Sequence, residues 1–180
     1  MNLKIELENY ISLFIQEEIY KQQILDFLVQ ADAPYERIND VGHITASAFL
    51  LNSDRTKFLL MHHKKLNLWV QPGGHCDGNS DILQVAMRET QEESGVSEII
   101  PIIANIFDID VHLIPANSKE KEHYHYDIRF LLKTLNNDNL VQNDESHELR
   151  WIDLKDYSNS GLMFNYSIIR MVEKYRNRFL

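Results

Sequence analysis

A glycine-containing loop followed by one well-delimited helix most constrains what this chain of 180 residues can fold into. The two lie within residues 69–96, WVQPGGHCDGNSDILQVAMRETQEESGV. Ser80 or Asp81 is suited to begin the helix, because short polar side chains cap the free N–H groups of a first turn. Gly95 is suited to end it, because glycine adopts the left-handed conformation of a helix C-terminus. The segment predicts a helix over residues 80–94.

The predicted helix crowds carboxylates at its C-terminal end. Glu89 and Glu93 are four residues apart and share a face, while Arg88 can pair with Glu92 on a neighbouring face. Two like charges on one face, near the negative end of the helix dipole, are unfavourable by themselves. A hard divalent ion such as Mg²⁺ supplies the missing positive charge, because it prefers carboxylate and water oxygens. An isolated Glu-Glu pair usually lies on the solvated surface, so the residues around it must show whether this pair forms a metal site.

The rest of the chain alternates strand and helix patterns without a regular βαβ repeat. An amphipathic helix is predicted over residues 164–179. Strands are predicted at 43–51, 57–63, 68–71, within 99–114, at 122–133 and at 148–154, with the first two forming a hairpin around the turn NSDRT. These patterns favour an α/β fold in which helices cover a mixed sheet.

The N-terminal region is predicted to be helical. Residues 3–14 and 20–31 each place apolar side chains on one helical face, and the phase slips between them. Two short helices or one kinked helix fit, closed by Pro34, because proline disfavours helix in the residue before it. We expect residues 1–34 to pack as an extension on a domain spanning 40–180. The extension either caps that domain or forms the interface of a homodimer.

One predicted strand, residues 122–133, carries an unusual polar face. His123, His125, Asp127 and Arg129 alternate with apolar residues that point into the core. Alternating histidines can bind zinc, but no fourth ligand is evident in the sequence. A substrate-facing or exposed polar face is therefore the preferred interpretation, with His125 and Arg129 placed to contact an anionic group.

Composition excludes several classes of protein. The net charge of −9 disfavours a long nucleic acid as partner, because phosphate backbones are bound through many lysines and arginines. No apolar run is long enough to cross a membrane. The single cysteine, Cys76, cannot form an internal disulfide, which fits a reducing compartment. We expect a cytoplasmic protein with a small-molecule ligand.

The loop and helix together resemble the signature of the Nudix hydrolase family, G-x5-E-x7-R-E-U-x-E-E-x-G-U, where U is aliphatic. Gly74, Arg88, Glu89, Glu92, Glu93, Gly95 and Val96 occupy their expected places. Two places differ: Ser80 stands where the family has its first glutamate, and Thr90 stands at the first U. Asp77 and Asp81 are the nearby acids that can substitute for the missing carboxylate.

The resemblance implies a Nudix-type α/β/α sandwich and Mg²⁺-dependent hydrolysis, with Mn²⁺ as an alternative ion, of a diphosphate linkage in a nucleoside diphosphate derivative. It implies Glu92 and Glu93 as metal ligands and Glu89 as a ligand or as the base that orients water. Arg88 would be their structural partner. A further acid outside the signature is expected, and Glu145 and Glu148 are the candidates, neither favoured over the other.

Substrate contacts are expected from the loop that leads into the signature. Gly73 and Gly74 allow the backbone to approach a ligand closely. His75 follows them, and Trp69 either stacks on a base or is buried beside the turn. An alternative function is a Nudix-fold module that binds or senses a nucleotide without cleaving it, which Ser80 favours and the intact glutamates disfavour.

Overall fold

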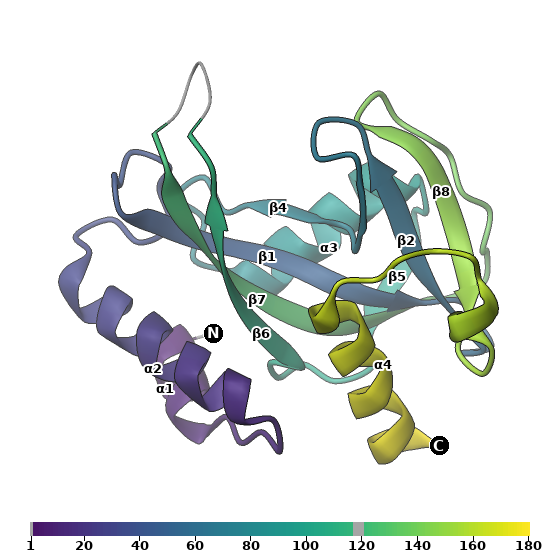
Figure 1. Ribbon diagram of the computed structural model, residues 1–180, viewed down its shortest axis with the longest axis horizontal. Helices are drawn as coiled ribbons and strands as arrows, with labels where there is room; N and C mark the ends of the chain where they lie inside the picture. The colour runs from purple at the N-terminus through teal and green to yellow at the C-terminus, as the bar shows by residue number, and fades with distance from the viewer. Residues whose placement is uncertain (1, 117–120) are drawn as a thin grey trace.

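The computed structural model describes residues 2–116 and 121–180 and contains one curled mixed sheet with helices on both faces (Figure 1). Along the chain the elements are α1 (Leu3–Asn9), α2 (Ile15–Gln30), β1 (Gly42–Leu51), β2 (Lys57–His63), β3 (Leu68–Val70), β4 (Gly73–His75), α3 (Ile82–Ser94), β5 (Ile99–Pro101), β6 (Asp108–Ile114), β7 (His123–Thr134), β8 (Ser146–Asp153), the 3₁₀ turn η1 (Tyr157–Asn159) and α4 (Tyr166–Phe179). Among the described residues, no helix has the length and apolar character needed to cross a membrane.

The sheet is built around the parallel pair β1 and β7. Its strands run in the order β3-β2-β1-β7-β5, with β4 also paired to β1, β6 to β7 and β8 to β2. The other pairings are antiparallel, so the sheet is mixed. Every residue of β1 is buried, as expected of a strand covered on both faces.

Two hydrophobic cores lie on opposite faces of this sheet. One contains alternate β1 residues, such as Ile44 and Leu50, together with side chains of α1, α2 and α3. The other contains Phe49 and Leu51 of β1 together with side chains of α4. Because successive side chains of a strand point to opposite faces, β1 supplies both cores. The predicted α/β/α sandwich is therefore confirmed.

The predicted helix of the signature is present as α3. Asp81 is its N-cap, and its side chain accepts a hydrogen bond from the Gln84 N–H at 3.3 Å. Gly95 ends the helix with a φ of 72°, the left-handed conformation that glycine tolerates best. Of the two predicted starting residues, the structure therefore selects Asp81.

The predicted hairpin of residues 43–51 and 57–63 is present as an antiparallel pair, but its two strands share few pairings beyond the turn. The backbone N–H of Asn52 donates a hydrogen bond to the Lys57 carbonyl at 3.0 Å. Within the described chain, however, Leu51 and Phe58 are the only residue pair that β1 and β2 share. Beyond that pair β2 is joined to β3, from Met61 to His63, while β8 pairs with the whole of β2 from Lys57 to His63. The divergence leaves room for β4, which pairs with the first half of β1.

The N-terminal extension consists of two helices, of which the first is shorter than predicted. α1 ends at Asn9, and Ile11, predicted on the buried face, is exposed. The Ser12 hydroxyl accepts a hydrogen bond from the Phe14 N–H at 3.0 Å and donates to Glu17. Serine side chains that bond to the local backbone compete with helix in this way, which explains the break.

A buried carboxylate fastens the extension to the domain. Glu17 is fully buried and accepts hydrogen bonds from the Tyr10 hydroxyl at 2.6 Å and from the Ile109 N–H of β6 at 3.1 Å. It also forms an ion pair with Lys174 of α4. Phe27 of α2 stacks on Tyr126 of β7 at 4.2 Å between ring centroids. The extension is thereby joined to β6, β7 and α4.

Candidate active site

The glutamate end of α3 lies against the backbone of β4. The Gly73 N–H donates a hydrogen bond to the Glu93 carboxylate at 2.8 Å. A Cβ atom at Gly74 would lie 2.3 Å from a carboxylate oxygen of Glu89, and one at Gly73 would lie 2.2 Å from the Cβ of Ser47 in β1. No side chain fits at either position without a shift of its neighbours. The two glycines therefore let α3 and β1 approach β4 from opposite sides.

The carboxylates of α3 carry unfavourable negative charge. Burial, together with the charges of Glu89, Glu145 and Glu92, raises the pKa of Glu93 to about 8, although the Gly73 hydrogen bond lowers it. Burial and the charges of Glu92 and Glu145 also raise the pKa of Glu89 against the effect of Arg88. Like charges in a desolvated site favour the protonated form, so this group of side chains lacks positive charge.

Arg88 supplies only part of that charge. Its guanidinium lies 2.8 Å from Glu89 and 3.5 Å from Glu92, and about two fifths of the side chain is exposed. It also donates to the His75 carbonyl at 3.5 Å. Arg88 thus contacts two of the glutamates and the backbone of β4.

The structure separates the two candidate acids outside the signature. Glu145 precedes β8, and its charge contributes to the raised pKa values of both Glu89 and Glu93. Glu148 lies within β8 and pairs with Arg150 at 2.6 Å instead. The Lys64 N–H donates to the Glu145 carbonyl at 2.9 Å, which anchors the loop that carries it. Of the two, Glu145 is the acid whose charge acts on both Glu89 and Glu93.

This donor set fits a hard divalent ion. Oxygen is the only ligand type that the carboxylates of Glu89, Glu92, Glu93 and Glu145 offer. Mg²⁺ and Mn²⁺ prefer oxygen ligands, whereas softer ions prefer nitrogen or sulfur. A bound dication would offset the mutual repulsion that raises the pKa of Glu93. The Cys76 sulfur does not compete as a ligand, because burial and the nearby carboxylates raise the pKa of its thiol to about 12.

The places at which the signature departs from its pattern are accommodated locally. Ser80 is exposed. The two neighbouring acids have other tasks: Asp81 caps α3, and Asp77 pairs with Arg37 at 2.5 Å. Thr90 is fully buried, and its hydroxyl donates to the Ala86 carbonyl at 2.6 Å, so it packs like the aliphatic residue expected there.

Beside the glutamates, the polar halves of β1, β7 and β6 form a floor of histidine, aspartate and arginine side chains. Three rows of facing residues cross the strands: His43, His125 and His112; Thr45, Asp127 and Asp110; Ser47, Arg129 and Asp108. Polar residues at alternate positions in each strand are the sequence signal for this floor. From the sequence, only the polar face of β7 was recognised, because local patterns do not show which strands pair with one another.

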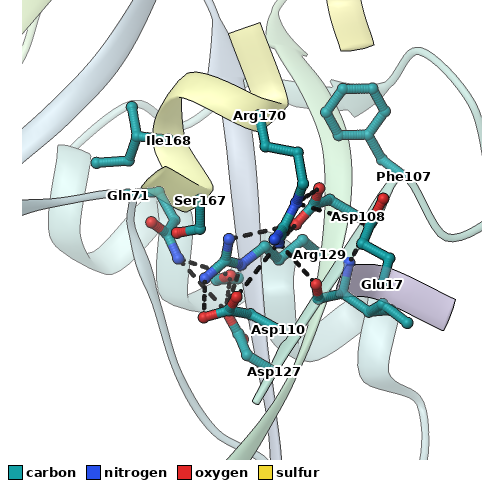
Figure 2. A network of polar contacts seen from close by, with 12 residues as sticks. Glu17, Gln71, Phe107, Asp108, Asp110, Asp127, Arg129, Ser167, Ile168 and Arg170 are labelled. Atoms are coloured by element: carbon teal, nitrogen blue, oxygen red, sulfur yellow. Dashed lines mark hydrogen bonds and ion pairs between the residues drawn. The ribbon is translucent and has the colours of Figure 1, made fainter. Parts of the chain in front are cut away.

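Arg129 does not face solvent, which corrects the prediction that it contacts an anionic ligand. The side chain is 2% exposed, and its guanidinium lies 2.8 Å from Asp127, 3.1 Å from Asp110 and 3.3 Å from Asp108 (Figure 2). Asp108 also binds Arg170 of α4 at 2.7 Å. Because carboxylates surround its guanidinium, Arg129 links the aspartates of the floor through buried ion pairs.

His125 lies at the centre of a group of histidines. Its ring centroid is 4.8 Å from that of His43, 5.0 Å from His75, 5.2 Å from His123 and 5.4 Å from His112. Burial, followed by the neighbouring imidazoles, keeps the pKa of His125 far below its usual range. The ring is therefore neutral near pH 7.

Trp69 lies at the edge of the sheet, on β3. Its partly exposed indole stacks on His62 at 5.2 Å between centroids, and the Arg150 guanidinium lies 5.0 Å from the ring centroid. The side chain is therefore not fully buried beside the turn, and its stacking on a base stays a prediction.

The family model of the NUDIX domain matches residues 42–172. The chain belongs to the Nudix hydrolase family. Among curated relatives, a probable DHNTP pyrophosphohydrolase of Lactococcus lactis subsp. cremoris (strain MG1363) is 31% identical over 99 residues, which are 54% of this chain and 57% of that protein. The human m7GpppN-mRNA hydrolase NUDT17 is 37% identical over 70 residues, which are 37% of this chain and 20% of that protein.

The Nudix chain thus spans just over half of the length of the Lactococcus protein and about a fifth of the length of NUDT17. A solved structure, the binary complex of the Ap4A hydrolase of C. elegans, superposes with a TM-score of 0.55 at 20% identity. The similarity covers 74% of this chain and 95% of that one. At this identity it supports the fold alone.

Proposed function

We propose that this Nudix protein is a Mg²⁺-dependent pyrophosphohydrolase, also able to use Mn²⁺, that cleaves the diphosphate linkage of a small nucleoside diphosphate derivative or nucleoside triphosphate. The observation that carries the proposal is the Glu93 carboxylate held by the Gly73 N–H, whose pKa is raised to about 8 by burial and by the charges of the neighbouring acids. A site that accumulates unbalanced negative charge beside a glycine backbone is suited to a divalent ion and a polyphosphate.

The roles follow from position. Glu92 and Glu93 are the first candidates to hold the metal, and Glu89 either joins them or orients the attacking water. Glu145 approaches the same carboxylates from the loop before β8 and is the candidate for the further acid. A divalent ion at such a site stabilises charge on phosphoryl oxygens and lowers the pKa of bound water. Gly74 lets the β4 backbone lie close to the Glu89 carboxylate, and the Gly73 N–H donates to Glu93.

The substrate class is inferred from the charge and chemistry of the site and from the relatives. The names of the similar proteins specify pyrophosphohydrolysis of DHNTP and hydrolysis of an mRNA cap or of Ap4A, each of which contains phosphate anhydrides. His75 and His125, on the polar floor, are the candidates to contact the group attached to the diphosphate, and Trp69 is a candidate to stack on a base. The net charge of −9 favours a small ligand over a long nucleic acid.

The test compares glutamate variants on a panel of nucleoside triphosphates, ADP-ribose, sugar nucleotides, dinucleotides and CoA, with and without Mg²⁺. Glu93→Gln should lower kcat by about 10²-fold or more, because ligation or proton transfer is lost while the side-chain shape is kept. Glu145→Gln should lower kcat at least tenfold, whereas Glu148→Gln, which alters the Arg150 pair, should leave it within about twofold.

Near-normal turnover of Glu93→Gln would contradict the proposal. Nucleotide binding by the unmodified protein without phosphate release would instead identify a binding or sensing module, the function that Ser80 favours. Wild-type release of phosphate that requires Mg²⁺ supports the enzyme.

Homodimer formation and a cytoplasmic location are also proposed. Ile11, Leu13 and Ile15 expose most of their side chains around the start of α2, which supports an interface between two copies. Light scattering should give the mass of a dimer, and Leu13→Asp should return it to that of a monomer.

A further inference from the structure

A second group of metal-ligating side chains lies apart from the glutamates. His43 of β1 and His125 of β7 face each other in the parallel pair, and His123 is two residues before His125 on the same strand face. Their ligating atoms all lie within 4.8 Å of one another. His43 and His123 are 3% and 8% exposed, and His125 is partly buried. Three imidazoles thus converge at a largely desolvated point.

The tautomer of His123 directs a lone pair into this group. Its Nδ1 lies 2.8 Å from the Lys121 carbonyl, which can only accept a hydrogen bond, so Nδ1 carries the proton. The Nε2 atom of the neutral ring is then an acceptor, and it lies 3.3 Å from the Nε2 of His125. Histidine ligands of zinc are commonly oriented in this way, with the other ring nitrogen donating to a carbonyl.

The spacing matches zinc coordination. Two nitrogens that bind a tetrahedral Zn²⁺ at about 2.0–2.1 Å lie about 3.3–3.4 Å apart. His123 and His125 already have this separation. The His43 ring centroid lies 4.8 Å from that of His125 and 5.0 Å from that of His123, and its ligating atom lies within 4.8 Å of theirs, so His43 is placed to complete a three-nitrogen set.

Two further histidines surround the same point. The ring centroids of His75 and His112 lie 5.0 and 5.4 Å from that of His125. His112 Nδ1 is 3.3 Å from the Asp110 carboxylate, an arrangement that leaves its Nε2 as a potential acceptor. Either ring, or a water molecule, is placed to supply the fourth ligand that a tetrahedral site requires.

We propose that His43, His123 and His125 bind a zinc-class transition metal ion, at a site distinct from the Mg²⁺ site of the glutamates. Imidazole nitrogen suits zinc, whereas Mg²⁺ prefers oxygen, so the two sites select different ions. The ion would connect β1 to β7 at the polar floor. This proposal depends on the histidine geometry alone and stands whether or not the chain hydrolyses nucleotides.

The test is binding of the metal alone to chelator-treated full-length protein. Calorimetry with Zn²⁺ should show one site that millimolar Mg²⁺ does not displace. Co²⁺ should bind at the same site and give the intense visible absorption of a tetrahedral nitrogen-ligated ion. His123→Gln and His125→Gln should each weaken zinc binding at least tenfold, because loss of a group that merely hydrogen-bonds to a ligand already costs about 10–100-fold.

Two controls separate this site from others. His147→Gln removes an exposed histidine of β8, and Glu93→Gln alters the proposed Mg²⁺ site; both should keep wild-type zinc affinity. Circular dichroism and thermal unfolding should show that each variant is folded, and His123→Gln suffices if His125→Gln is not. Zinc binding that is absent in the wild type, kept in a folded His123→Gln, or lost in Glu93→Gln would overturn the proposal.

Discussion

Lys174 of α4 should be among the most sensitive positions for stability. Its ammonium pairs with the fully buried Glu17 and, at 3.0 Å, with the fully buried Asp108, and it donates to the Phe107 carbonyl at 3.1 Å. Lys174→Met keeps much of the apolar stem but leaves two buried carboxylates with less compensation. Removing one partner of a buried ion pair typically costs about 3–5 kcal/mol.

That cost is large beside the total stability of a domain, about 5–15 kcal/mol. For a chain of this length each kcal/mol shifts Tm by about 2–4 °C, so Lys174→Met should lower Tm by about 6–20 °C. Arg176→Met is the matched control, because it removes an exposed positive charge two residues further along α4. Arg176→Met should change the free energy of unfolding by no more than about 0.5 kcal/mol.

The assay is thermal and urea unfolding of four proteins at neutral pH: wild type, Lys174→Met, Arg176→Met and Glu17→Gln/Lys174→Met. The double variant should recover part of the loss, because the glutamine that replaces Glu17 is neutral yet still offers an acceptor to the Ile109 N–H. If Lys174→Met lowers Tm no more than Arg176→Met does, the network around Lys174 does not anchor the N-terminal extension.

Three further predictions concern the loop, the helix cap and acid stability. Gly74→Ala should lower kcat more than tenfold with little change in Tm, because its Cβ would displace the flexible Glu89 carboxylate, 2.3 Å away; equal turnover would contradict this role. Asp81→Ala should cost about 1 kcal/mol, or about 2–4 °C in Tm measured by calorimetry, through loss of the α3 cap. Burial would raise the pKa of Asp108, but the Arg170 hydrogen bond and the charges of Lys174 and Arg129 outweigh it and lower that pKa. This stabilisation is present above the unfolded value of about 3.9 and is lost as the pH falls below it towards the lowered pKa of the folded state, so urea midpoints should fall as the pH is lowered below about 4; a constant midpoint would refute the linkage.

The signature helix was predictable because its determinants are local. A capping aspartate, a terminal glycine and glutamates at helical spacing act within α3, so residues 80–94 were correctly predicted as a helix. The amphipathic C-terminal helix was predicted for the same reason and is present as α4. Rules based on spacing along one element are sufficient for both.

What the sequence did not reveal depends on partners from distant elements. Arg129 appeared exposed because the alternation along β7 shows only two faces, not that β6 and α4 place Asp108, Asp110 and Arg170 around it. His43 was not singled out, because its relation to His125 arises from a parallel pairing of strands about 80 positions apart in the chain. The hairpin is short for a related reason: β4 pairs with the first half of β1, and β3 pairs with the end of β2.

The connection before β1 limits how parts of this protein can be exchanged with those of relatives. The Tyr35 carbonyl accepts a hydrogen bond from the Gly78 N–H at 3.0 Å, Arg37 pairs with Asp77, and a Cβ atom at Gly78 would lie 2.4 Å from the Glu36 carboxylate. Residues 35–37 and the loop before α3 are therefore a single contact surface contributed by two segments. A chimera that takes its N-terminal extension from another family member must take the matching loop as well, or the loop before α3 will lose its contacts with residues 35–37.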